Sequence, residues 1–81
     1  MFKIYDKKEP TYDEARKFIG GYIQSVPLQN GDSLLCDEEG KLKRLPHNAE
    51  AQKVWDESWG EGTDYIVGNA ILVKAEVNKG W

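Results

Sequence analysis

The stretch that decides the fold is YIVGNAILVK, which runs from Tyr65 to Lys74. Apolar and β-branched residues occupy both alternating faces of this stretch, a pattern typical of a strand that is covered on both sides. We therefore predict a strand over residues 65–74 near the middle of a sheet. Gly68 interrupts the run, and a glycine inside a strand indicates a bulge or a close approach of another backbone.

The first 20 residues predict a strand followed by a helix. Residues 2–6 alternate between apolar and polar side chains, which predicts a first strand. Thr11 and Glu14 have the spacing of a capping box, in which each side chain accepts a hydrogen bond from the other residue's backbone N–H. We expect a helix over residues 12–19 that ends at Gly20.

The middle of the chain predicts antiparallel strands. We expect a second strand over residues 22–28 and a third over residues 33–37, joined by a type I′ turn at Asn30-Gly31. Pro27 lacks an N–H group, so this end of the second strand should lie at a sheet edge or leave the ladder. A further tight turn at Gly40 leads to a short fourth strand over residues 41–45.

A second helix is predicted before the central strand. Asn48 is a favourable N-cap for a helix over residues 49–58. Its apolar stripe has helical spacing and consists of Ala51, Val54, Trp55 and Trp59.

These elements predict a single α+β domain over residues 1–81 with the order β-α-β-β-(β)-α-β. Each helix has one apolar stripe to bury, so we expect a two-layer sandwich of helices on a mainly antiparallel sheet. A ferredoxin-like arrangement is the leading topology.

Composition excludes several classes of protein. The 81 residues carry a net charge of −3, which gives no polycationic surface for nucleic acid, so we expect nucleic acid to be an unlikely partner. No apolar run approaches the roughly 20 residues of a membrane span. The opening residues are typical of a strand rather than of a leader, and the single cysteine fits a reducing cytoplasm.

The residues available for catalysis are few. Cys36 and His47 could form a small hydrolase or transferase site, but Asp37 and its acidic neighbours would raise the pKa of the thiol. We expect Cys36 to be a core residue and His47 a turn residue. One cysteine and one histidine do not supply a structural zinc site. We therefore predict a protein without enzymatic activity, cofactor or bound metal.

A small basic patch offers one alternative function. It consists of Lys41, Lys43, Arg44 and His47 and follows an acidic turn. Such a patch could bind a small anion or a nucleotide through its phosphates. A mixed, solvated edge that discourages strand pairing is the simpler interpretation.

The three tryptophans favour a different function. An 81-residue domain has little interior for Trp55, Trp59 and Trp81 together, and tryptophan is enriched at protein interfaces. We expect this set to contribute to a contact with a partner protein or to a homodimer seam. Stacking of single-stranded nucleic acid on the indoles is the alternative, although the negative charge disfavours it.

Four segments of the chain occur in the order and spacing of a known family. They are Gly20–Ile23, Asp37–Leu42, Leu45–Asn48 with Ala51, and Asp64–Ala70. The chain resembles, over about residues 16–74, a small domain family of unknown function found widely in tailed bacteriophages, including cyanophages. Members often have a small residue at the position of Arg44. The resemblance implies a phage-encoded accessory protein in the cytoplasm of the infected host cell, and it implies no catalytic residues. Because the chain lacks catalytic groups and is rich in tryptophan, we expect this protein to bind a host or phage protein and modulate it.

Overall fold

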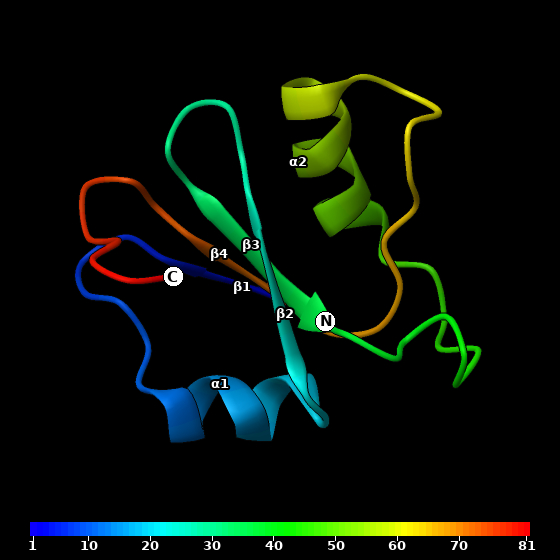
Figure 1. The fold of residues 1–81 in the computed structure, drawn as a ribbon, viewed down its shortest axis with the longest axis horizontal. Coiled ribbons are helices and arrows are strands. Elements are labelled where there is room, and N and C mark those ends of the chain that lie inside the picture. Colours follow the sequence, from blue (N-terminus) through cyan, green and yellow to red (C-terminus); the bar gives the residue numbers. More distant parts are fainter.

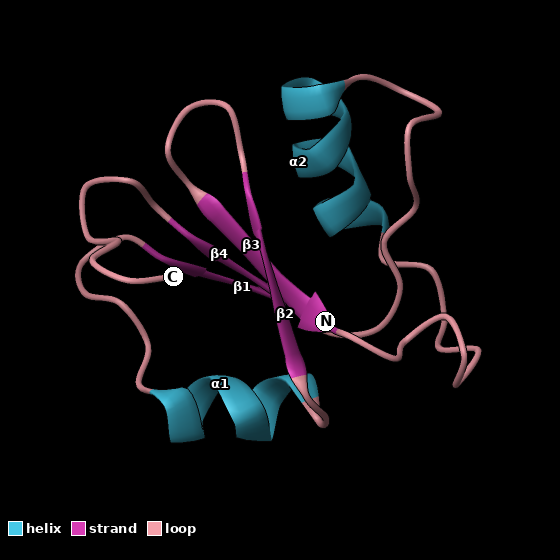
Figure 2. Cartoon of the chain, viewed as in Figure 1, coloured by secondary structure: helices cyan, strands magenta, loops and turns pink.

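The sheet is built from four strands and flanked by two helices (Figure 1). The computed structural model describes residues 1–81 and contains β1 (Phe2–Tyr5), α1 (Tyr12–Ile19), β2 (Ile23–Pro27), β3 (Ser33–Asp37), α2 (Ala49–Trp59) and β4 (Ala70–Val73). The strand order is β1-β4-β3-β2; β1 runs parallel to β4, and the other two pairings are antiparallel. This confirms the α+β class, the element order and the edge position of Pro27 (Figure 2).

The helix boundaries follow from their caps. The Thr11 hydroxyl accepts the Glu14 N–H, and the Glu14 carboxylate accepts the Thr11 N–H, so the predicted capping box is confirmed. Gly20 ends α1 in the left-handed conformation with φ 83°. The Asn48 side chain accepts the Ala51 N–H at the start of α2, as expected.

The two helices lie on opposite faces of the sheet. The α2 side of the sheet buries Leu34, Cys36, Ala70 and Leu72, whereas the α1 side buries Leu35, Ile71 and Val73. The expected two-layer sandwich is therefore replaced by three layers, helix, sheet and helix (Figure 1). The ferredoxin-like topology is also not the observed one, because β3 and β4 are antiparallel neighbours. Two central strands that are apolar on both faces need cover from both sides.

The hairpin between β2 and β3 forms, but its turn differs from the predicted type I′. Only Gly31 has a positive φ, at 93°, and Asn30 does not. The Gly31 N–H donates to the Leu28 carbonyl, and the Leu28 N–H donates to the Asp32 carbonyl. These bonds close a three-residue loop that ends in a left-handed glycine. The Asn30 side chain accepts the Asp32 N–H, which fixes the loop in this form.

The predicted fourth strand over residues 41–45 is wrong. This segment forms hydrogen-bonded turns instead, in which the Lys43 N–H donates to the Glu39 carbonyl and the Leu45 N–H to the Gly40 carbonyl. Arg44 has φ 57°, a left-handed conformation incompatible with a strand. This conformation also accounts for the small residue expected at this position, since glycine adopts it without steric cost.

The strand predicted over residues 65–74 is shorter than expected. β4 begins only at Ala70, and Val67 contributes a single isolated bridge with His47. Gly68 has φ 77°, and a Cβ at this position would lie 2.7 Å from the Leu45 Cδ1 atom. This contact is with a side chain rather than with another backbone, whereas the expected central position of β4 is confirmed.

Candidate protein-binding surface

Two tryptophans project from the same side of α2. Trp55 and Trp59 are four residues apart, which places them on one helix face, with ring centroids 6.3 Å apart and planes inclined by 43°. Trp59 remains 42% exposed, and its indole N–H donates to the Pro27 carbonyl at 3.2 Å. Trp55 is partly buried against the core on this side of the sheet. We call Trp55 and Trp59 the tryptophan pair.

The segment that follows α2 holds Trp55 in place. The Trp55 indole N–H donates to the Thr63 hydroxyl at 2.8 Å, and that hydroxyl donates to the Gly60 carbonyl. The Gln52 side chain donates to the Asp64 carbonyl and accepts the Ile66 N–H at 2.8 Å. These hydrogen bonds attach residues 60–66 to α2, the helix that carries both indoles.

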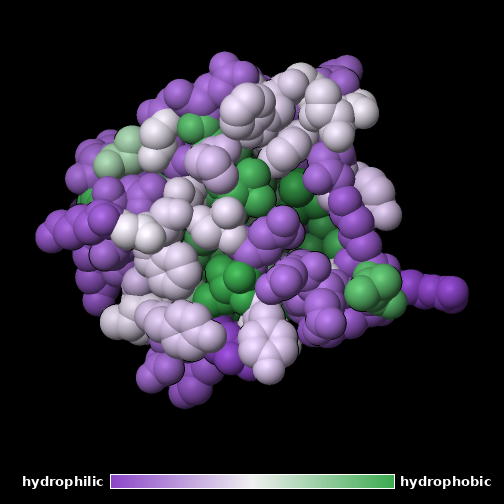
Figure 3. Space-filling view, in the orientation of Figure 1, coloured by the Kyte–Doolittle hydropathy of each residue, from purple (hydrophilic) through white to green (hydrophobic).

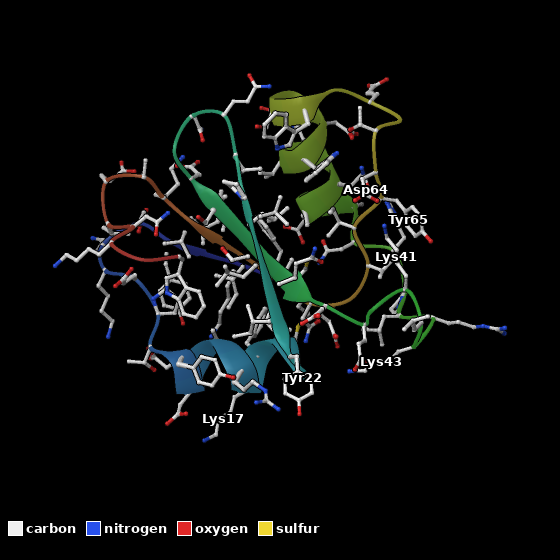
Figure 4. All side chains as sticks on the ribbon, viewed as in Figure 1. Lys17, Tyr22, Lys41, Lys43, Asp64 and Tyr65 are labelled. Atoms are coloured by element: carbon white, nitrogen blue, oxygen red, sulfur yellow. The ribbon has the colours of Figure 1, made fainter.

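A cavity of about 190 Å³ opens beside Trp55. Its walls come from β2, β3 and residues 64–67, and they include Gln24, Val26, Cys36, Trp55 and Ile66. At its rim Lys41 forms an ion pair with Asp64 and lies 4.3 Å from the centroid of the Tyr65 ring. Figure 4 shows these three side chains gathered on one side of the molecule.

The thiol in this cavity is electrostatically unfavourable as a nucleophile. Burial raises the pKa of the Cys36 thiol, and the negative charges of Asp37 and Asp64 raise it further. The thiol is therefore protonated at neutral pH, as the interpretation of Cys36 as a core residue requires. His47 lies just before α2, where its Nε2 atom is 3.1 Å from the Gln52 Oε1 atom.

Both lysines of the basic patch are paired with carboxylates, whereas Arg44 forms no ion pair. Lys41 is paired with Asp64, and the Lys43 Nζ atom lies 2.8 Å from the Asp37 Oδ2 atom. The hydrogen bond from Lys41 holds the pKa of Asp64 below its usual value. Burial raises the pKa of Asp37, but the hydrogen bonds from Lys43 and from the Glu39 N–H outweigh it and leave a lowered pKa. An anion at this patch would have to compete with both carboxylates.

The sequence comparison identifies the family. Residues 3–80 match the domain of unknown function DUF3846. The chain belongs to this family. No curated protein and no solved structure shows a significant match to the chain. The longer helix of this DUF3846 domain has 11 residues, so no helix here has the length and apolarity to cross a membrane.

The third tryptophan of the DUF3846 domain lies away from the tryptophan pair. Trp81 is partly buried against the core on the α1 side, and its indole N–H donates to the Pro10 carbonyl at 3.2 Å. Its own carbonyl accepts the Ser25 hydroxyl of β2. The sheet therefore separates Trp81 from Trp55 and Trp59, and a role for Trp81 in binding stays a prediction.

Two exposed tyrosines were missed by sequence reasoning. Tyr22 is 60% exposed and Tyr65 is 54% exposed, although both were assigned to strands. The Arg16 guanidinium lies 4.7 Å from the centroid of the Tyr22 ring, as Lys41 does near Tyr65. In Figure 3 the apolar groups on this side of the molecule are interspersed with hydrophilic residues rather than joined in one patch. No local motif signals these cation–π pairs, because their members come from different elements.

Proposed function

We propose that this DUF3846 domain is a phage-encoded, non-enzymatic accessory protein that binds a host or phage protein and modulates it in the cytoplasm of the infected cell. One observation carries the binding role: Trp59 of the tryptophan pair is 42% exposed, and its neighbour Trp55 lines an open cavity. The phage origin rests on the resemblance of the four sequence segments described above.

The environment of the tryptophan pair suits an interface anchor. Tryptophan is enriched among the residues that contribute most binding energy, above all next to pockets that exclude water. Both indole N–H groups are already bonded within the domain, Trp55 to Thr63 and Trp59 to the Pro27 carbonyl. The rings are thus held before binding, which reduces the conformational entropy lost when a partner docks.

The electrostatics favour this function over the alternatives. The raised pKa of Cys36 argues against a thiolate enzyme, and the ion pairs of Lys41 and Lys43 argue against an anion or nucleotide site. The net charge of −3 argues against a nucleic-acid site that would rely on attraction to phosphates.

The test is affinity capture from infected cells followed by a binding measurement with the captured protein. We expect Trp59→Ala to weaken this binding at least about tenfold, equivalent to about 1.4 kcal/mol. Tyr12→Ala is the matched control, because Tyr12 is an aromatic residue of α1 that is 54% exposed and lies away from the cavity.

Three results would contradict the proposal. One is equal binding by wild type and Trp59→Ala. Another is capture of nucleic acid with an affinity that falls steeply with salt, which would indicate recognition of phosphates. The third is a phosphate-bearing ligand whose binding is abolished by Lys41→Ala or Lys43→Ala.

A further inference from the structure

The cavity beside Trp55 has apolar walls that are already fixed in position. These walls come from β2, from α2 and from the segment that returns to β4, and they consist of Val26, Trp55, Ile66 and Val67. The Trp55 indole N–H is held by the Thr63 hydroxyl, and the Ile66 N–H is held by the Gln52 side chain. A ligand therefore meets walls that need little ordering when it binds.

The size of the cavity suits one apolar group. Its volume is about 190 Å³. An engineered apolar cavity of about 150 Å³ binds benzene, so the space beside Trp55 accommodates one phenyl ring or one branched alkyl group. Contact with these walls removes such a group from water, which favours its binding.

An ion pair lies at the rim of this cavity. Lys41 and Asp64 both line the cavity and are paired with each other, and Figure 4 shows them on the same side of the molecule as Tyr65. Their side chains are 45% and 40% exposed, so a ligand can reach both charges from solvent. The cavity thus combines an apolar interior with one cation and one anion at its rim.

Each member of this ion pair has a second contact that holds it at the rim. The Lys41 Nζ atom lies 4.3 Å from the centroid of the Tyr65 ring, within the range of an attractive cation–π contact. The Asp64 carboxylate accepts the Tyr65 N–H at 2.8 Å. When the direct contact between Lys41 and Asp64 opens, these bonds keep both charged groups beside the cavity.

The ion pair restricts the charge that a ligand can carry. An anion bound to Lys41 leaves Asp64 without its partner, and a cation bound to Asp64 leaves Lys41 without its partner. A ligand with an ammonium and a carboxylate on the same carbon replaces one charged contact by two, so neither side chain loses its partner. The other two carboxylates that line the cavity do not change this balance, because Asp37 is paired with Lys43 and Glu38 is exposed to water.

We infer that this cavity binds a free α-amino acid with an apolar side chain. The α-ammonium group pairs with Asp64, the α-carboxylate pairs with Lys41, and the apolar side chain occupies the interior beside Trp55. The inference goes beyond the proposed binding of a host or phage protein, which rests on the exposed Trp59, and does not depend on it.

The test is isothermal titration calorimetry of the full chain with phenylalanine and with analogues that each lack one of its features. We expect a dissociation constant below about 1 mM for phenylalanine. Phenethylamine lacks the carboxylate and phenylpropionate lacks the ammonium, so each should bind at least about tenfold more weakly. Glycine keeps both charges but lacks the side chain, and its binding should be weaker by at least the same factor.

Variants of the rim and of the interior assign the binding to this cavity. Lys41→Met and Asp64→Asn each remove one charge and should weaken phenylalanine binding at least about tenfold. Val26→Phe fills the interior and should weaken binding by at least the same factor while leaving the ion pair intact. Lys17→Met and Asp13→Asn are the matched controls, because both residues are exposed on α1, across the sheet from the cavity; they should leave binding unchanged.

The inference is overturned if phenylalanine does not bind at concentrations up to about 20 mM, or if Lys41→Met and Asp64→Asn bind it as wild type does. It is also overturned if N-acetylphenylalaninamide, which lacks both charges, binds as tightly as phenylalanine, because the cavity then recognises only an apolar side chain, such as one from a partner protein. None of these measurements involves Trp59. Equal protein binding by wild type and Trp59→Ala therefore contradicts the proposed function and leaves this inference standing.

Discussion

Replacing Trp81 by alanine should destabilise the domain much more than replacing Trp59. Trp81 is partly buried against a core cluster that contains Ala15, Ile19, Leu35, Ile71 and Val73. A fully buried tryptophan replaced by alanine costs about 3–5 kcal/mol of unfolding free energy. Because Trp81 is only partly buried but also donates to the carbonyl of buried Pro10, we expect a cost of about 3 kcal/mol.

Replacing Trp59 by alanine should lower the unfolding free energy less. Trp59 is 42% exposed, and its indole N–H donates to the Pro27 carbonyl at the edge of the sheet. We expect Trp59→Ala to cost about 1 kcal/mol, since little apolar surface is returned to water and the Pro27 carbonyl can be solvated.

Urea unfolding followed by far-ultraviolet circular dichroism measures both values. A domain of this size has a slope of about 1 kcal/mol per M urea, so the midpoint should fall by about 3 M for Trp81→Ala and about 1 M for Trp59→Ala. Equal shifts, or a larger shift for Trp59→Ala, would refute the reasoning. Equal shifts would mean that Trp81 contributes no more to the stability of the fold than Trp59 does.

Three further predictions concern single side chains. Asp32→Asn should lower the unfolding free energy by about 2 kcal/mol at pH 7, because the buried carboxylate accepts from the Lys74 ammonium and the Ala75 N–H. Burial alone would raise the pKa of Asp32, but these bonds leave it lowered. Its stabilisation is therefore full above the ordinary aspartate pKa and lost as the pH falls through the folded-state value, so urea midpoints of the two proteins should converge in acid. Arg44→Gly should raise the melting temperature, with a gain of about 0.5–1 kcal/mol, because Arg44 has φ 57°; a lower melting temperature would mean that its side chain contributes more than the backbone strain costs. Alkylation of Cys36 at pH 7 should be slow because its pKa is raised, and fast labelling would revive the enzyme hypothesis.

The local structure was predictable where a single short segment determines it. The capping box of Thr11 and Glu14, the N-cap at Asn48 and the hairpin between β2 and β3 depend on residues within a few positions of one another. The turn type at Asn30-Gly31 was not predictable, because the Asn30 side chain accepts the Asp32 N–H and thereby fixes a three-residue loop in place of the type I′ turn. Arg44 shows the same limit, since its left-handed conformation belongs to turns that replace a strand.

The layer arrangement required information that the helix stripes do not contain. An apolar stripe shows that a helix is buried on one side, but not which face of the sheet it covers. The deciding property lies in β3 and β4, which are buried along their whole length and so require a helix on each face. The two-sided apolar character of residues 70–73 is visible in the sequence and predicts a central strand, but it does not show which helix covers which face.

The sequence also does not show that the sheet separates Trp81 from Trp55 and Trp59. Trp55 and Trp59 could be grouped from their spacing, because i and i+4 residues share a helix face. Trp81 has no periodic neighbours, and the face it occupies depends on a tail anchored by Asn78, which donates to Ser33 and accepts the Trp81 N–H. Lys41 and Asp64 are 23 positions apart, so their pairing depends on the return of the chain after α2. A basic patch inferred from neighbouring positions in the sequence therefore overstates the free positive charge. The grouping of Trp55 and Trp59, by contrast, follows from helix spacing alone, and the exposure of Trp59 makes this pair the stronger basis for a binding role.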